Sequence, residues 1–235
     1  MKSFTLDIAY ENANFIVLNK QQGLLSQGDE SCDPNIVDLL RDYLGRPYVG
    51  LVHRLDRNVS GLMVVAKRTK AARRLTEFLQ NGSLKRTYLG VVEGHLHEPK
   101  TLENYLLKNE VTNHVRVVPA SEHGAKISKL FYRPVKIGQT RKEGKEITLI
   151  ELVLDTGRSH QIRVQMAEAG HSLVGDPKYG SGKTKGTDSP ALFSAKLEFP
   201  SPILDVTTIG NGYSFDFTAP DKWPKSWNED FYFPD

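Results

Sequence analysis

The sequence has little cysteine and no long apolar run. Cys32 is the single cysteine among 235 residues, so the chain cannot form an internal disulfide or a zinc site built on several thiolates. The apolar run at 147–154 is interrupted by Thr148 and Glu151 and is much shorter than a membrane span requires. The first residues lack the apolar core and cleavage site of a secretory signal. We therefore expect a cytoplasmic protein without a membrane partner.

A strong excess of one charge is also absent. The net charge is +3 and the pI is near 8.8, so the total charge says little about a nucleic-acid partner. The distribution of charge is more informative, because between residues 67 and 86 only Glu77 opposes a cluster of basic residues: Lys67, Arg68, Lys70, Arg73, Arg74, Lys85 and Arg86. Such a cluster can follow a phosphate backbone, although a solvated helix face has the same appearance.

The pattern of apolar residues predicts an α+β fold. With 39% hydrophobic residues the chain can bury a full core, and we expect one globular domain over residues 1–235. Helices are predicted near 33–45, with Asp33 as the N-cap and Gly45 at the end, and over 69–79 and 159–169. Strands are predicted over 4–10, 15–19, 62–66, 85–93, 101–107, 115–119, 126–137, 147–154, 191–199 and 213–217. Consecutive strands with few helices favour a mixed, largely antiparallel sheet with flanking helices.

A polar loop at 50–61 leads directly into the apolar strand predicted at 62–66. This loop contains the run His53-Arg54-Leu55-Asp56. Polar groups in a loop beside a buried strand are well placed for chemistry, because the strand holds the loop in position. Taken alone, Asp56 would more readily be explained as a residue that caps a helix or closes a turn.

The same loop resembles the signature of RluA-like pseudouridine synthases. That signature reads His-Arg-Leu-Asp, two variable residues, Thr-Ser-Gly, and then an aliphatic strand that ends in Ala-Lys, as Ala66-Lys67 does here. Further segments resemble the family's motifs in the family's order, at 17–24, 86–94, 156–163 and 174–180. The resemblance extends from about residue 15 to about residue 200. Several ordered motifs together make a chance match a poor explanation.

The resemblance implies an enzyme that isomerises uridine to pseudouridine within structured RNA, either ribosomal or transfer RNA. The reaction breaks the bond between C1′ of ribose and N1 of uracil, turns the base, and rejoins it through C5. It requires neither a cofactor nor a metal. By resemblance Asp56 is the catalytic carboxylate, which either attacks the sugar or removes a proton from it. The resemblance also implies a sheet crossed by a central RNA-binding cleft, in a chain that acts as a monomer.

Two further catalytic residues are implied by the same resemblance. Arg163 resembles the family's partner of the catalytic carboxylate, because a nearby guanidinium favours the ionised acid. Tyr88 matches the position whose ring stacks on the target uracil, and its hydroxyl is a candidate for removing the C5 proton. Each residue has a plainer explanation: Tyr88 as a packing residue of a strand, and Arg163 as a surface residue paired with Glu168.

The target nucleotide is inaccessible within a stacked helix and must be flipped out. Arg54 resembles the residue that fills the vacated space. We expect RNA to contact the motif loop, the basic helix and the 156–163 segment through His53, Arg54, Arg57, Lys67, Arg68, Arg73, Arg74, Lys85, Arg86 and Arg158. His53 and His160 are also expected to serve as hydrogen-bonding scaffold, because no third metal ligand occurs at a standard spacing. The polar segment 180–188 is expected to form a mobile basic loop near RNA.

Four departures from the family pattern are expected to adjust the rim and the scaffold: Gln21 for proline, Val59 for threonine, Gln165 for histidine and Ser194 for the histidine of Leu-His-Ala. The accessory N-terminal RNA-binding module of many relatives is not expected in this chain. Two other functions remain open: an RNA-binding protein or RNA chaperone that kept the fold without the chemistry, and a nucleoside hydrolase. The hydrolase would need a second acidic residue, and none lies beside the Asp56 loop in the sequence.

Overall fold

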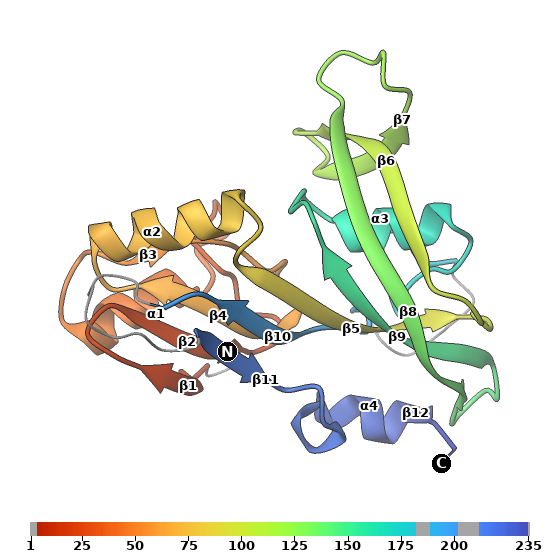
Figure 1. Ribbon diagram of the computed structural model, residues 1–235. Coiled ribbons are helices and arrows are strands. Elements are labelled where there is room, and N and C mark those ends of the chain that lie inside the picture. The colour runs from red at the N-terminus through yellow and green to blue at the C-terminus, as the bar shows by residue number, and fades with distance from the viewer. Residues whose placement is uncertain (1–3, 182–188, 202–211, 235) are drawn as a thin grey trace. The chain divides into compact units, whose positions relative to one another are not determined.

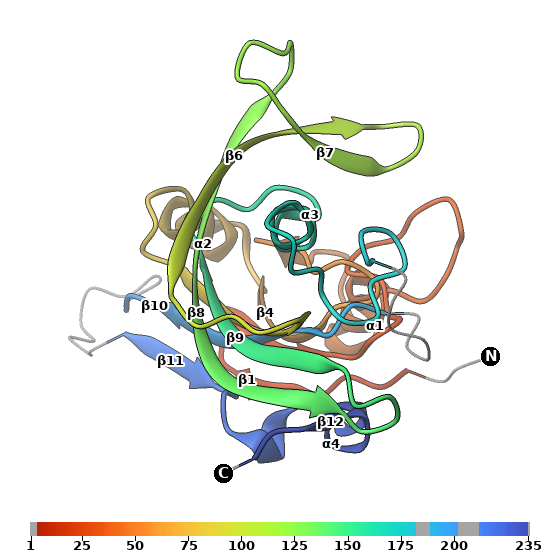
Figure 2. The same ribbon diagram turned by 90° about the vertical axis from the view of Figure 1, so that its right-hand side faces the viewer.

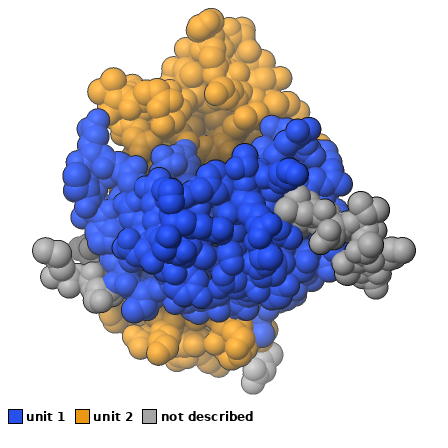
Figure 3. Space-filling model, turned by 90° about the vertical axis from the view of Figure 1, so that its left-hand side faces the viewer, with its two compact units in different colours: residues 1–86, 194–219 blue, residues 87–193, 220–235 orange. Residues whose placement is uncertain are grey.

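The computed structural model describes residues 4–181, 189–201 and 212–234 (Figure 1). Contacts group the chain into two compact units: unit 1 comprises residues 1–86 and 194–219, and unit 2 comprises residues 87–193 and 220–235 (Figure 3). The single domain expected over 1–235 stays a prediction. In the part of the chain that the structure describes, no helix is long and apolar enough to cross a membrane.

Unit 1 is built on antiparallel strands. β2 pairs with both β1 and β4, β3 pairs with β4, and β11 pairs with β10. Most residues of β2 and β4 are buried, as expected for apolar strands that are covered on both faces. The strand bounds are β1 (Ile8–Glu11), β2 (Phe15–Lys20), β3 (Gly50–Leu51), β4 (Ser60–Ala66), β10 (Leu192–Phe199) and β11 (Tyr213–Asp216).

The core of unit 1 joins segments that are far apart in the sequence. The ring of Phe15 lies 5.4 Å from that of Phe199 and 4.9 Å from that of Tyr213. Helix α2 (Thr69–Gln80), predicted over 69–79, lies beside the strands of unit 1 (Figure 1), and its apolar side chains pack into this core. Its buried residues are Ala71, Leu75 and Phe78, and Ala72 and Leu79 are partly buried.

Helix α1 (Ile36–Leu44) ends at Gly45, as predicted, but the predicted cap Asp33 is wrong. Asn35 is the N-cap, and its side chain accepts a hydrogen bond from the backbone N–H of Asp38. The preceding residues are held extended, because Leu25 donates to the carbonyl of Pro34 and accepts from the N–H of Ile36. The helix therefore begins two residues later than the sequence suggested.

Unit 2 contains a longer antiparallel sheet, which confirms the largely antiparallel α+β prediction. The strands follow the order β5-β9-β8-β6-β7, and β12 pairs with β8. Figure 2 shows α3 on the concave side of the curved strands. The bounds are β5 (Lys85–Glu93), β6 (Lys100–Asn109), β7 (His114–Val118), β8 (Lys126–Thr140), β9 (Glu146–Leu154), α3 (Gln161–Glu168), α4 (Lys225–Asp230) and β12 (Phe231–Tyr232).

Candidate functional site

Asp56 lies in the loop between β3 and β4, and the main chain on each side of it is held by hydrogen bonds. The hydroxyl of Ser26 donates to the carbonyl of Leu55 at 2.7 Å and accepts from the N–H of Leu55 at 3.1 Å. The carbonyl of Arg57 accepts from Nζ of Lys20 at 3.1 Å and from the N–H of Gly23 at 2.9 Å. The residues that precede and follow Asp56 are thus fixed by one short segment, 20–26.

Lys20 is a buried cation in this arrangement, with 0% of its surface exposed. Its ammonium also donates to the carbonyls of Leu24 at 2.7 Å and Gln21 at 3.1 Å. Burial lowers the pKa of Lys20 to about 7, and the charge of Asp56 opposes that shift. An attractive interaction therefore links the buried ammonium to the Asp56 carboxylate. The sequence motifs gave no role to Lys20, although a lysine at the end of a strand that begins with the apolar run 15–18 is a signal of an unusual site.

His53 connects the start of the loop to β4. Its Nε2 accepts a hydrogen bond from the backbone N–H of Val64 at 3.2 Å, so this nitrogen carries no proton. Burial, together with the charge of Arg86, lowers the pKa of His53 to about 3. His53 and Arg86 are both buried, which argues against direct contact with RNA. We assign both to the scaffold and leave them out of the RNA-binding surface proposed below.

Gly61, next to the loop, is required by a close approach of two backbones. Its φ of +114° lies in a region that side chains disfavour, and a Cβ at this position would lie 2.3 Å from the carbonyl oxygen of Ser194. The hydroxyl of Ser194 in turn donates to the carbonyl of Leu62 at 2.9 Å. The glycine of the motif therefore permits the contact that places the loop against β10.

Arg163 is held in unit 2 by a buried, bidentate ion pair. Its Nε and Nη2 each lie 2.7 Å from a carboxylate oxygen of Asp176. The two side chains are 9% and 1% exposed, and the guanidinium lies 5.1 Å from the centre of the Tyr179 ring. The surface pairing of Arg163 with Glu168, considered from the sequence, is therefore wrong. The motif at 174–180 contains Asp176, but sequence reasoning gave it no role.

Asp176 remains ionised in this buried position. Burial alone would raise the pKa of its carboxyl, but the hydrogen bond and charge of Arg163 and two backbone N–H groups hold the pKa below its ordinary value. Those N–H groups belong to Lys178 and Tyr179, at 2.9 and 3.1 Å. Gly180 completes this turn, because a Cβ there would lie 2.2 Å from the carbonyl oxygen of Asp176.

Tyr179 links Arg163 to the residues that begin α3 and β7. Its hydroxyl accepts from the N–H of Val115 at 2.9 Å and lies 2.8 Å from Nδ1 of His160. His160 adopts a left-handed backbone conformation with a φ of 52° immediately before the helix. These contacts support the scaffold role expected for His160, because the imidazole is used to anchor the start of the helix that carries Arg163.

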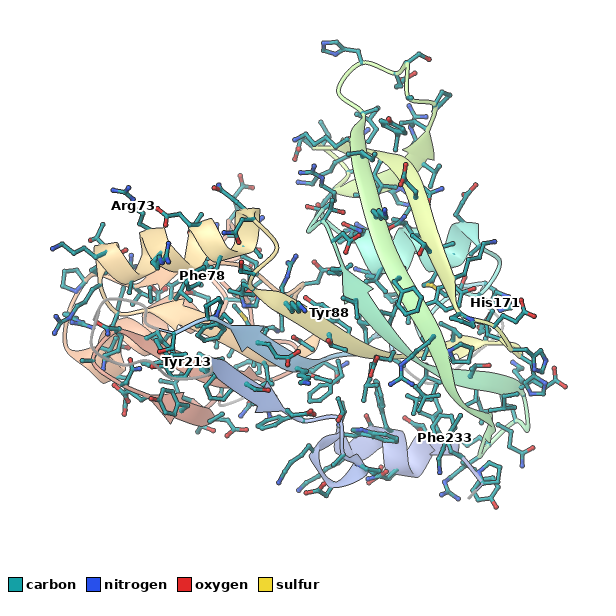
Figure 4. The ribbon with its side chains drawn as sticks, viewed as in Figure 1. Arg73, Phe78, Tyr88, His171, Tyr213 and Phe233 are labelled. Atoms are coloured by element: carbon teal, nitrogen blue, oxygen red, sulfur yellow. The ribbon has the colours of Figure 1, made fainter. Side chains whose placement is uncertain are left out.

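Tyr88 lies on β5 (Figure 4), and the strand register places it on the face of the unit 2 sheet that α3 covers. In the strand register Tyr88 lies opposite Leu152, and Leu152 lies opposite Tyr132, so the three share one face. By the same alternation Leu106 belongs to that face, and Leu106 packs against Val164 of α3. Unit 2 therefore places Tyr88 and Arg163 on the same side of its sheet. That Asp56 approaches them stays a prediction.

Most of the other residues expected to contact RNA are exposed, and several form ion pairs. Arg54, Arg68, Lys85 and Arg158 are exposed, and Nε of Arg158 donates to the carbonyl of Ile127. Arg57 pairs with Asp33 at 2.8 Å, and Lys67, which is largely buried, pairs with Glu11. Arg73 and Arg74 both pair with Glu77 at 3.1 Å. Of the polar segment 180–188, only residues 180 and 181 lie within the described residues.

Comparison with known proteins decides the family. Residues 14–168 match the family described as RNA pseudouridylate synthase. The chain belongs to this family. Ribosomal large subunit pseudouridine synthase D of Escherichia coli K12 is 35% identical over 216 residues, which cover 87% of this chain and 62% of that protein. Synthase C of Haemophilus influenzae is 35% identical over 181 residues, 74% of this chain and 52% of that protein. The chain thus spans between half and two thirds of the length of these relatives.

Solved structures show the fold of the pseudouridylate synthase family in this chain. Human RNA pseudouridylate synthase domain containing 1 has a TM-score of 0.75 and 22% identity, over 95% of this chain and 91% of its own. Human RNA pseudouridylate synthase domain containing 4 has a TM-score of 0.70 and 18% identity, over 94% of this chain and 90% of its own. The pseudouridine synthase fold predicted from the motifs is therefore confirmed.

Two departures from the family pattern lie in the scaffold. Gln165 is 1% exposed, and its amide nitrogen lies 2.8 Å from Oδ1 of Asn104 and 3.2 Å from the carbonyl of Ser128. Gln165 thus ties α3 to β6 and β8. Ser194 is fully buried and hydrogen-bonded to β4, as described above. Gln165 therefore joins elements within unit 2, and Ser194 joins β10 to β4 within unit 1.

Proposed function

We propose that this chain is an RNA pseudouridine synthase that isomerises specific uridines, with Asp56 as its catalytic carboxylate. The observation that carries the proposal is the family's Asp56 loop, which the structure holds by its main chain on both sides of the acid. A reacting group must be held near its productive geometry, and this loop meets that requirement. The names of the bacterial relatives favour ribosomal RNA of the large subunit as the substrate, with transfer RNA as the alternative.

In the proposed reaction Asp56 acts on the ribose of a nucleotide flipped out of its stack. Its carboxylate either bonds to C1′ as the bond from C1′ to N1 breaks, or takes the 2′ proton to begin that cleavage. In both routes the ammonium of Lys20 holds the loop by donating to the carbonyl of Arg57. The base turns and C5 bonds to C1′, which breaks the bond from Asp56 to C1′ in the first route and is accompanied by return of the proton to C2′ in the second. N1 gains a proton, and the C5 proton is then removed. Tyr88 stacks on the uracil and is the candidate base for that last step.

Arg163 is the proposed partner of Asp56. A guanidinium has five N–H donors, so pairing with Asp176 does not prevent contact with a second carboxylate. The pair with Asp176 fixes the plane of the guanidinium, and Tyr179 lies against its face. The guanidinium of Arg163 is thereby held in a fixed orientation, in which we propose that it pairs with the carboxylate of Asp56. The proposed catalytic residues are therefore Asp56, Arg163 and Tyr88, and the proposed reaction uses no cofactor.

Basic residues, all of them exposed except the largely buried Lys67, form the proposed RNA-binding surface. They act by neutralising phosphates, and Arg54 enters the space left by the flipped nucleotide. The surface comprises Arg54, Arg57, Lys67, Arg68, Arg73, Arg74, Lys85 and Arg158. A monomer acting in the cytoplasm is the predicted working form.

The proposal is tested with RNA carrying tritium at C5 of uridine, since isomerisation releases the label. We expect Asp56→Asn to lose at least about a thousandfold in turnover while RNA affinity changes by less than about threefold. Asp42→Asn is the matched control, because Asp42 is an exposed acid of α1 in the same unit, and we expect it to behave as wild type.

Other results would contradict the role of Asp56 or favour a different function. Tritium release by Asp56→Asn at the wild-type rate would refute the assignment. RNA binding without tritium release by the wild-type protein would favour the RNA-binding protein or chaperone. Free uracil among the products would favour the nucleoside hydrolase.

A further inference from the structure

Ser26 makes two hydrogen bonds to a single residue that is 29 positions away in the sequence. Its hydroxyl donates to the carbonyl of Leu55 and accepts from the N–H of the same residue, at 2.7 and 3.1 Å. Ser26 and Leu55 are only 5% and 6% exposed, so water cannot easily replace either bond. One hydroxyl thus satisfies both backbone groups of Leu55, as a neighbouring strand would.

The position of Leu55 determines the starting direction of the Asp56 side chain. The carbonyl of Leu55 belongs to the same planar peptide unit as the N–H of Asp56. A hydrogen bond to that carbonyl therefore fixes the plane from which Asp56 projects. On the other side the carbonyl of Asp56 accepts from the N–H of Val59 at 3.0 Å, so both peptide units that flank Asp56 are restrained. The next carbonyl, that of Arg57, is held by Lys20 and Gly23.

We propose that Ser26 is a positioning residue for the isomerisation, which sets the orientation of Asp56 through the backbone of Leu55. The inference rests on the proposed function of Asp56. It assigns to Ser26 no contact with RNA and no part in proton transfer. Misplacement of a reacting group by about 1 Å can cost on the order of a hundredfold in rate, so loss of this hydroxyl should appear mainly in kcat.

The chain offers a closely matched control in unit 2. Thr148 is 0% exposed, and its hydroxyl donates to the carbonyl of Gly94 at 2.7 Å and accepts from the N–H of Leu96 at 3.0 Å. Thr148→Val, like Ser26→Ala, removes one donated and one accepted backbone hydrogen bond, but the bonds of Thr148 are made to Gly94 and Leu96 and not to a residue that flanks Asp56. General destabilisation should therefore be similar in the two variants.

The experiment measures kcat and KM for tritium release from C5-labelled RNA, with the denaturation midpoint of each variant. We expect Ser26→Ala to lower kcat about 10- to 100-fold with KM within about threefold, while Thr148→Val keeps both constants within about threefold. Ser26→Thr, which keeps the hydroxyl, should recover kcat to within about threefold. Ser26→Cys has a weaker donor of similar shape and should give an intermediate kcat, so it carries the test should Ser26→Ala fail to fold.

A wild-type kcat in Ser26→Ala, or in Ser26→Cys should the alanine variant not fold, would overturn the inference. Equal losses of kcat in Ser26→Ala and Thr148→Val would also overturn it, because the effect would then follow stability alone. The outcome stays separate from that of the proposed function. Full turnover by Asp56→Asn defeats the function itself, whereas an inactive Asp56→Asn beside a fully active Ser26→Ala defeats only the role of Ser26.

Discussion

Unit 1 and unit 2 hold their candidate catalytic residues in different ways. Around Asp56 the hydrogen bonds from Lys20, Gly23 and Ser26 reach the main chain of the residues on either side. Around Arg163 the contacts reach the side chain itself, through the carboxylate of Asp176 and the ring of Tyr179. In the first arrangement, hydrogen bonds to peptide groups set the position of the acid. In the second, one ion pair sets both the position and the charge environment.

The largest expected effect concerns the ion pair of unit 2. Asp176→Ala leaves the guanidinium of Arg163 buried without its paired carboxylate, and we expect a loss of about 3–5 kcal/mol in the free energy of unfolding. Chemical denaturation followed by circular dichroism measures this change. The expected loss is large because charge and position depend on one contact.

The same unit provides an exposed control with similar geometry. Arg133 and Glu151 form a bidentate pair at 2.8 and 3.0 Å, but Arg133 is 52% exposed. Glu151→Ala should cost less than about 1 kcal/mol, because water screens an exposed pair. Equal losses in Asp176→Ala and Glu151→Ala would show that burial of the pair does not set its importance.

An intermediate effect is expected in the pH dependence of unit 1. The unfolded chain binds a proton at His53 below a pH of about 6.5, whereas burial holds the pKa of the native residue near 3. The free energy of unfolding should therefore fall as the pH drops through this range, by about 2 kcal/mol from pH 7 to pH 5 for this residue. His53→Gln keeps an acceptor for the N–H of Val64 and should lose that part of the slope. Parallel pH profiles for wild type and His53→Gln would contradict a buried, neutral histidine.

The smallest expected effect concerns the exposed basic residues. Their ion pairs lie in solvent and are not buried as that of Arg163 is. Arg73 on α2 is 85% exposed and paired with Glu77. Arg73→Ala should weaken RNA binding only about two- to fivefold and reduce the slope of log affinity against log salt by about 0.7–0.9. Arg41→Ala, on the exposed face of α1, is the control and should leave both quantities unchanged. A salt slope that is equal in wild type and Arg73→Ala would remove Arg73 from the proposed surface.

Local patterns predicted the regular elements well. The strand at 85–93 has the predicted bounds, and α2 begins at the predicted residue. These segments succeed because apolar periodicity reports directly on burial. The short C-terminal helix α4 was not predicted, since its six residues include only one buried apolar side chain, Trp227.

The supports of the candidate site could not be predicted in the same way. Polar residues such as Lys20, Ser26 and Asp176 are usually assigned to the surface, yet all three are buried. The partners that connect them to the loop of Asp56 or to Arg163 lie 37, 29 and 13 positions away in the sequence, too far for any local pattern to join them. Motif resemblance found Asp56 and Arg163 because it compares residues directly. It gave no information about which neighbours hold them.

The unit 1 core has a consequence for biosynthesis. Phe15 and Val17 are synthesised early, but the rings that pack around them belong to Phe199, Tyr213 and Phe215. The early strands must therefore remain incompletely covered while the intervening polypeptide leaves the ribosome. Residues 87–193 of unit 2 are complete before these aromatic rings emerge. Unit 2 in turn lacks β12, the partner of β8, until residues 220–235 are synthesised, so both units depend on late segments. We expect β2 to be the segment of unit 1 most in need of a chaperone until residues 194–219 emerge.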